Sequence, residues 1–159
     1  MFGAVILHAP VLRFDLLRPL RRPISDRLFG ANKTWRGALV MFTGVFLATG
    51  VFWSLMPEEL DSWPLAGALI GAGTVLGELP NSFLKRRLGI APGERRVTPA
   101  GFALVVYDQA DFVPGIALAL LPVWTMPLDT LAIGFVAVAA VHFVVNVIGY
   151  LIGAREKPI

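Results

Sequence analysis

The sequence predicts an all-α, polytopic integral membrane protein that forms a single domain over residues 1–159. Three observations support this prediction. Of the residues, 56% are apolar and only 16% are charged, whereas a soluble domain carries about 25% charged residues. Several apolar runs approach or exceed the roughly 20 residues that a helix needs to cross a bilayer. The 14 lysines and arginines gather between these runs instead of being spread along the chain.

The apolar runs predict about four transmembrane helices after a short N-terminal apolar segment. Residues 1–12 are too short to span, and they lack the basic start and cleavage site of a signal peptide. Residues 37–56 and 128–153 are long enough to span unaided. Residues 64–84 span only with the polar side chains near their end inside the membrane. Residues 112–124 need additional residues from their flanks.

The distribution of basic residues predicts the orientation. All 14 lie within residues 13–36, 85–96 and 155–157, and the turns at 57–63 and 122–127 contain none. Because Lys and Arg stay on the cytoplasmic side of short loops, four spans place the three basic regions, and hence the active-site loops, in the cytoplasm. The net charge of +3 suggests anionic partners without choosing among nucleic acid, lipid headgroups and nucleotide phosphates. Because the basic residues gather beside the spans, we expect membrane lipids and nucleotide phosphates as partners, and no nucleic acid.

Two pairs of glycines four residues apart lie in the second expected span, Gly67 with Gly71 and Gly73 with Gly77. Small residues at this spacing let helices approach closely in lipid. We therefore expect these glycines to pack against neighbouring helices, and the same surface is compatible with a homodimer.

A first polar cluster, GANKTWRG at residues 30–37, ends where the first long span begins. Lys33 and Arg36 are suited to holding phosphate, and the Thr34 hydroxyl adds a donor. Anchoring at the cytoplasmic membrane surface would explain the same two cations, so the pattern alone leaves both interpretations open. The cluster is not a P-loop, because the second glycine before the lysine is missing.

A second polar cluster, ELPNSFLKRRLG at residues 78–89, ends the second expected span. A carboxylate inside a membrane is costly, so Glu78 is a functional candidate, with Asn81 and Ser82 one turn further along. Three consecutive basic residues follow: Lys85, Arg86 and Arg87. Phosphate binding and attraction to an anionic leaflet explain this basic run equally well.

A third polar cluster, YDQAD at residues 107–111, precedes the third apolar run that we expect to span. Asp108 and Asp111 are three residues apart at a helix start and share one face. Such a pair suits Mg²⁺, which takes one or two carboxylates and substrate phosphates, although helix capping by Asp competes with this interpretation. For His142 and Asn146, four residues apart in the last span, interhelical hydrogen bonding is a simpler explanation than metal ligation.

Two basic clusters and one acidic pair thus meet on the cytoplasmic face, which suits binding or transfer of a polyphosphate at the lipid boundary. In this order, the strings LFGANKTWRG, GELPNSFLKRRLGI and DQADF resemble the CDP-archaeol synthase family, small membrane enzymes related to the CDP-diacylglycerol synthases. The resemblance covers most of the chain from Arg22 to about Gly115.

The resemblance implies a CTP-dependent cytidylyltransferase in which a lipid phosphate attacks the α-phosphate of CTP, giving a CDP-lipid and pyrophosphate with the help of Mg²⁺. In archaea the lipid would be unsaturated archaetidic acid, and a phosphatidic-acid-like acceptor is the other possibility. A catalytically silent membrane scaffold or lipid-binding module of the same fold is the alternative, since Glu78 stands where an aspartate is expected and Pro80 interrupts the helix.

The resemblance also implies roles for individual residues. The residues expected to act on the phosphates are Lys33, Arg36, Lys85 and Arg86. The residues expected to bind substrate are Thr34, Asn81, Ser82 and Arg87. The expected metal ligands are Asp108 and Asp111, with Glu78 as a third. A lipid phosphate monoester is already anionic near neutral pH, so neither a covalent nucleophile nor a strong general base is expected.

Overall fold

The computed structural model describes residues 7, 10–11, 13–59, 62–92, 94 and 99–151, and all structural statements below concern those residues. The described residues form helices and no strand, as the sequence predicts. In chain order the elements are η1 (Arg18–Arg21), α2 (Asp26–Phe29), α3 (Trp35–Leu55), η2 (Pro57–Glu59), α4 (Trp63–Arg87), α5 (Pro99–Tyr107), α6 (Phe112–Leu120) and α7 (Leu128–Leu151). An isolated β-bridge joins Pro23 to Thr34 and ties the segment before α2 to the start of α3.

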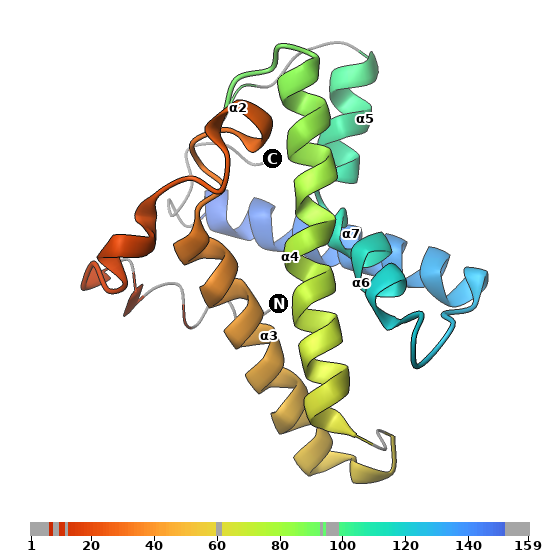
Figure 1. Cartoon of the computed structure of the whole chain (residues 1–159). Helices are drawn as coiled ribbons and strands as arrows, with labels where there is room; N and C mark the ends of the chain where they lie inside the picture. The colour runs from red at the N-terminus through yellow and green to blue at the C-terminus, as the bar shows by residue number, and fades with distance from the viewer. Residues whose placement is uncertain are drawn as a thin grey trace.

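α3 and α4 form an antiparallel hairpin (Figure 1). α3 begins at Thr34, whose Oγ1 accepts a hydrogen bond from the Gly37 backbone N at 3.1 Å and so satisfies an otherwise orphaned helix donor. Gly67 and Gly71 of α4 face α3, because a Cβ built on Gly71 would lie 3.0 Å from the Phe42 ring. The first glycine pair therefore packs the hairpin, as expected from its spacing.

The second glycine pair faces α6 on the other side of α4. A Cβ on Gly73 would lie 2.6 Å from Ile116 Cα, and one on Gly77 would lie 2.8 Å from Phe112 Cα. Gly115 of α6 faces them, and its Cβ would be 2.4 Å from the Gly73 carbonyl oxygen. The backbones of α4 and α6 are thus in direct contact, which only residues without a side chain allow.

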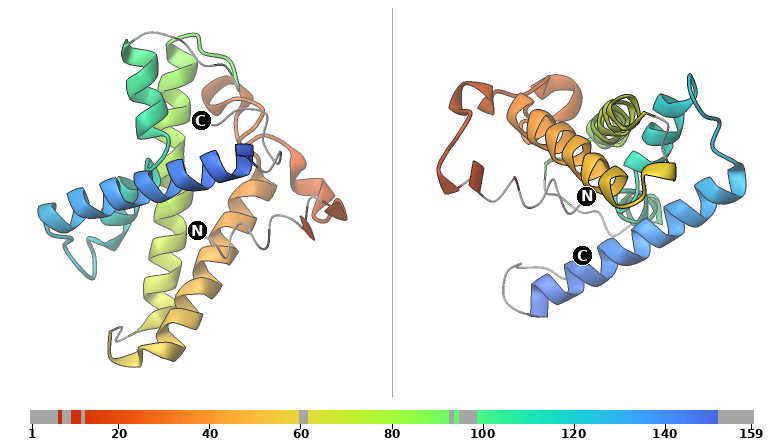
Figure 2. Two further views of the ribbon diagram at one scale, coloured as in Figure 1. Left: turned by 180° about the vertical axis from the view of Figure 1, so that it is seen from behind. Right: turned by 90° about the horizontal axis from the view of Figure 1, so that it is seen from below.

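α7 crosses the α3–α4 hairpin instead of running along it (Figure 2). It is attached to the turn between α5 and α6, where Asn146 Nδ2 donates to Gln109 Oε1 at 2.9 Å. The Phe135 ring also lies 6.0 Å from the Tyr107 ring. Asn146 thus makes a hydrogen bond to a distant segment, as predicted, but its partner Gln109 lies in a turn and not in another helix.

Two of the four predicted spans are matched by described helices that are long and apolar enough to cross a membrane, α3 and residues 128–148 of α7. The third, residues 64–84, lies within the 25-residue helix α4. The fourth is shorter than predicted, because α6 ends at Leu120 and its nine residues rise only about 14 Å. A hydrocarbon core is about 30 Å thick. Because only two described helices are long and apolar enough, the four-span count stays a prediction. The N-terminal apolar segment lies mostly outside the described residues.

Replacing Gly73 by alanine is expected to destabilise the fold by about 1–3 kcal/mol or more, because the new Cβ would meet backbone atoms of Gly115 and Ile116 at 2.6 to 2.9 Å. Thermal unfolding of the detergent-purified protein measures this. Gly134→Ala in α7 is the matched control, since its Cβ would find its nearest atom at 4.0 Å. Equal midpoints for the two variants would contradict the packing described here.

Candidate active site

A cavity of about 130 Å³ lies between α3, α4, α6 and α7. Three carboxylates line it: Glu78 from α4, Asp108 from the turn that follows α5, and Asp111 from the start of α6. Thr74 and His142 are its other polar lining residues, and apolar side chains of α3, α4 and α6 complete the wall. The acidic residues of two predicted clusters, thirty positions apart in the chain, therefore meet at one cavity.

One face of α4 carries most of the polar side chains of the site. Thr74, Glu78, Asn81 and Lys85 follow each other at intervals of three or four residues, the spacing that aligns side chains along a helix. Pro80 lies inside α4 and on its exposed side. The helix continues through this proline, so the polar stripe stays in register with the cavity.

Asn81 connects the two aspartates. Its Nδ2 donates to Asp108 Oδ1 and to Asp111 Oδ2, each at 2.8 Å, and only 2% of the residue is exposed. Asp111 occupies the N-cap position of α6, yet its side chain makes no capping hydrogen bond. Capping therefore does not explain this aspartate, and its carboxylate is instead directed to Asn81.

Two lysines neutralise part of the acidic charge. Lys33, just before α3, forms an ion pair with Glu78, and Lys85 Nζ lies 2.5 Å from Asp108 Oδ1. Both ammonium groups are largely buried, so these pairs are screened less than pairs on an open surface. Three carboxylates against two ammonium groups leave the cluster with one excess negative charge if every group is ionised.

The pKa of Asp111 is raised by its buried position and by the neighbouring carboxylates. Burial, with a smaller contribution from the charges of Glu78 and Asp108, raises the pKa of Asp111 from 3.8 to about 7. The hydrogen bond from Asn81 and the charge of Lys33 act in the opposite direction and only partly offset the rise. A carboxyl with so perturbed a pKa in a cavity is a candidate functional group.

The aspartate pair fits a hydrated Mg²⁺ ion, and the three carboxylates together do not form a ready metal site. In the part of the chain that the structure describes, no group of three or more acidic or histidine side chains is arranged to hold a metal ion. Asp108 Oδ1 and Asp111 Oδ2 share one nitrogen at 2.8 Å, so at most twice that distance separates them. Mg²⁺ keeps several waters and takes one or two carboxylates beside substrate phosphates, and the cavity has room for several waters.

The remaining predicted site residues lie elsewhere. Arg36 NH1 contacts Asp15 Oδ1 at 2.9 Å, and Thr34 is occupied in capping α3. Ser82 is buried in α4, and Arg86 donates to the Ile90 backbone carbonyl. The Arg87 guanidinium stacks over the Phe83 ring at 5.1 Å. These five residues do not line the carboxylate cavity; Arg86 and Arg87 line a separate small pocket together with Arg27.

The structure brings to these sites three residues that sequence reasoning did not place there: His142 was interpreted only as an interhelical hydrogen-bonding residue, and Thr74 and Asp15 were not considered. His142 lines the cavity and its ring lies 5.9 Å from that of Phe112, edge on. Thr74 lines the same cavity one turn before Glu78. Asp15 is the partner of Arg36. The four-residue spacing from Thr74 to Glu78 could have indicated the second of these, whereas the first and third depend on contacts between distant segments.

Comparison with known proteins places the chain among the nucleotidyltransferases that use CTP. It belongs to the CDP-archaeol synthase family, because the family described as CarS-like, CDP-archaeol synthase, matches residues 23–159. The family resemblance seen in the sequence is thereby confirmed, as is the assignment to membrane-associated transferases of phospholipid biosynthesis.

Individual relatives agree with the family match. The chain is 37% identical over 152 residues to the CDP-archaeol synthase of Methanoculleus marisnigri, which covers 87% of each chain. It is 35% identical over 148 residues to that of Halobacterium salinarum, covering 83% of this chain and 76% of the relative. It is 31% identical over 138 residues to the CDP-archaeol synthase of Pyrococcus horikoshii, covering 83% of this chain and 75% of the relative. No solved structure matches the chain.

Asp111→Asn is expected to stabilise the ligand-free protein at alkaline pH. Because the pKa of Asp111 is raised from 3.8 to about 7 on folding, the folded state binds the extra proton and wild-type stability falls as the pH rises between these values. The variant lacks this group, so its thermal midpoint should exceed that of wild type above about pH 7, and the difference should vanish below about pH 4. A midpoint lowered at every pH would show that the carboxylate is structural.

Proposed function

We propose that this chain catalyses the transfer of CMP from CTP to a lipid phosphate, giving a CDP-lipid and pyrophosphate. The observation that carries the proposal is the pair Asp108 and Asp111, joined by Asn81 at 2.8 Å on each side in a cavity shared with Glu78. Two aspartates held this close, with lysines at the rim, suit a metal–triphosphate complex.

In this proposal each residue of the cavity has a task. Asp108 and Asp111 would hold Mg²⁺, which neutralises phosphate charge when it is bound. Lys85 would leave Asp108 for a phosphate oxygen of CTP as the metal takes over its carboxylate. Lys33 would similarly exchange Glu78 for the acceptor phosphate. The acceptor is already anionic near neutral pH, so its oxygen attacks the α-phosphate without a general base, and the P–O bond to pyrophosphate breaks as the new bond forms.

The acceptor is proposed to be unsaturated archaetidic acid, an isoprenoid glycerol phosphate. The support is that the relatives named above are called CDP-archaeol synthases and match most of the chain. Phosphatidic acid carries the same phosphate monoester, so only the hydrocarbon chains and their linkage distinguish the two acceptors.

The protein is proposed to be polytopic, with four spans and the carboxylate cavity toward the cytoplasm. α3 and residues 128–148 of α7 are the apolar candidates, and none of the latter is buried. An apolar helix surface with no protein cover suits a lipid environment. α4 would be the third span, and α6 together with its flanks the fourth. Because α7 crosses the α3–α4 hairpin in this structure (Figure 2), four spans in one bilayer require α7 to turn so that it runs along the hairpin. Lys33 and Lys85, which lie at the cavity, belong to regions that the distribution of basic residues places inside the cell.

The reaction itself is tested with purified protein, Mg²⁺ and labelled CTP, offered separately unsaturated archaetidic acid and phosphatidic acid. Label is expected in a CDP-lipid with the first acceptor. Asp108→Asn and Asp111→Asn should each lower kcat by about 100-fold or more, because each removes a charged group that the transition state needs. Asp129→Asn, on the exposed start of α7, is the matched control and should retain full activity.

Binding of Mg²⁺ and CTP distinguishes the enzyme from the alternative, a catalytically silent membrane module. A silent membrane module would form no CDP-lipid from either acceptor while its thermal midpoint stayed unchanged by Mg²⁺ and CTP. Turnover with phosphatidic acid alone would keep the cytidylyltransferase assignment and overturn the proposed acceptor.

The orientation can be tested directly because the chain contains no cysteine. Single cysteines at Ser62, before α4, and Thr125, before α7, should react with a membrane-impermeant maleimide added to intact cells. Ala91, exposed after α4, should react as Ala91→Cys only after the cells are opened. Labelling of Ala91→Cys in intact cells would overturn the proposed orientation.

A further inference from the structure

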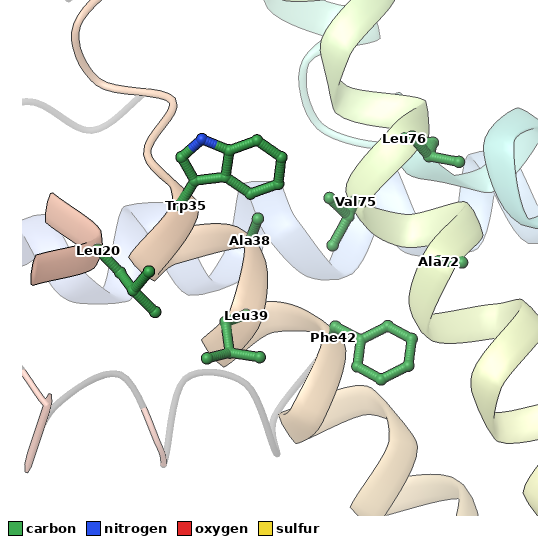
Figure 3. A pocket seen from close by; sticks show the side chains of 8 residues that line it. All are labelled: Leu20, Trp35, Ala38, Leu39, Phe42, Ala72, Val75 and Leu76. Carbon is green, nitrogen blue, oxygen red and sulfur yellow. The ribbon is translucent and has the colours of Figure 1, made fainter. Parts of the chain in front are cut away.

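A second cavity, of about 410 Å³, lies on the α3–α4 hairpin and is lined almost entirely by apolar side chains (Figure 3). Leu20 of η1 and Trp35 stand at one end, and the groove continues between Ala38 and Phe42 of α3 and Ala72 of α4. Ala38 and Ala72 leave its floor open, since each contributes only a methyl group.

This groove is separate from the carboxylate cavity although the same two helices form both. The groove takes Ala38, Leu39 and Phe42 from α3, whereas the cavity takes Met41 and Val45. On α4, likewise, the two share no residue. The hairpin therefore presents a polar site to one side and an apolar groove to the other.

A cluster of arginines lies close in the chain to the end of the groove where Leu20 and Trp35 stand, although none of them lines the groove. Arg21 and Arg36 follow these two residues directly in the chain. Their guanidinium groups lie 3.3 Å and 2.9 Å from the same oxygen, Asp15 Oδ1, and Arg18 Nε lies 3.4 Å from Asp15 Oδ2. One carboxylate thus occupies a site that three arginines form, and arginine is the side chain best suited to binding phosphate.

The backbone that delivers this carboxylate is strained. Asp15 has φ +46° and Leu17 has φ +55°, a left-handed conformation that costs free energy for residues other than glycine. The Asp15 side chain is also 41% exposed, so it can leave the arginines without opening the core. An anion that binds the same arginines from outside would take the place of this carboxylate.

We propose that the groove and the arginines together form the acceptor site, in which the phosphate of the lipid displaces Asp15 from Arg36 and Arg21 while one hydrocarbon chain lies along the groove. This inference rests on the proposed function and names the place where its lipid substrate binds. The fixed anion Asp15 holds the arginines in the absence of lipid and competes with the acceptor.

The dimensions and the position of the groove favour a lipid. From Trp35 to Phe42 the groove follows two turns of α3, about 10 Å, which is most of one leaflet's hydrocarbon thickness of roughly 15 Å. Lys33 lies three residues before Arg36 and forms an ion pair with Glu78 of the carboxylate cavity. A phosphate on Arg36 is therefore three residues along the chain from Lys33, the residue that leads into the proposed reaction site.

Asp15→Asn is the first test, because competition and structural support predict opposite signs. Without the competing charge, KM for the lipid phosphate should fall by about two- to fivefold, the range expected when an exposed ion pair no longer has to be broken, while kcat and KM for CTP stay unchanged. Glu58→Gln, an exposed acid at the far end of the hairpin, is the matched control and should behave as wild type. A raised KM for lipid would overturn the displacement of Asp15.

Filling the groove is the second test. Ala38→Leu should raise KM for the long-chain acceptor and leave that for a short-chain, water-soluble phosphate of the same headgroup unchanged. Ala48→Leu adds the same volume on an exposed position of α3 outside the groove and should change neither. Equal effects of the two leucines would overturn the assignment of the groove.

A binding measurement separates failure of this inference from failure of the proposed function, because it needs no turnover. In a variant whose only tryptophan is Trp35, brominated lipid phosphate in detergent should quench the fluorescence, and Ala38→Leu should abolish the quenching. Inorganic phosphate added with brominated phosphatidylcholine distinguishes a lipid headgroup from a free phosphate. Quenching by that mixture equal to quenching by the lipid phosphate would overturn recognition of a phosphorylated lipid.

Discussion

The direct contact between the backbones of α4 and α6 is the constraint on which the site depends. Gly77 faces Phe112, the residue that follows Asp111, so the closeness of the two helices determines how far Asp111 is from α4. Asn81 stands one turn after Gly77 and reaches Asp111 Oδ2 at 2.8 Å. A methyl group at Gly77 would collide with Phe112 Cα and push α6 away by more than this hydrogen bond tolerates. The glycine stripe is therefore part of the site although it contributes no functional group.

The negative charges of the cavity suit it to binding a cation. A sequence selected for stability alone would place an amide at position 111, because burial and two neighbouring acids penalise the aspartate. The chain keeps an acid there and holds it with the amide of Asn81, which supplies donors to both aspartates. The Asn81 Nδ2 group lies between the two carboxylates, where the attraction for a cation is strongest. The cluster is thus preorganised for positive charge, at a cost in stability that functional sites commonly carry.

Periodicity within one helix was predictable from the sequence, and contacts between helices were not. The spacing of Glu78, Asn81 and Lys85 places them on one face of α4, and in the structure Glu78 lines the cavity while Asn81 and Lys85 contact Asp108. Nothing in the sequence shows that Asn81 reaches the aspartates or that Asp15 pairs with Arg36, since both contacts close long loops. Arg86 directly follows Lys85 and therefore points to another side of α4, where it binds the Ile90 carbonyl. The start of α6 at Phe112 agrees with the predicted run of residues 112–124, but its end at Leu120 was missed, because hydropathy alone does not reveal where a helix stops inside an apolar stretch.

A reaction between a nucleotide and a lipid must bring together a substrate from water and a substrate from the membrane. At the start of α3, residues of the carboxylate cavity and of the arginine cluster lie close together in the chain. Lys33 belongs to the carboxylate cavity through Glu78, and Arg36 belongs to the arginine cluster at the groove. The Thr34 cap on Gly37 and the bridge between Pro23 and Thr34 fix the backbone between these two cations. The two cations are therefore held three residues apart along the chain on a segment that is anchored at both ends. From their residue types, Lys33 and Arg36 would both be expected to bind phosphate at one site. In the structure Lys33 pairs with Glu78 of the carboxylate cavity, and Arg36 pairs with Asp15 in the arginine cluster.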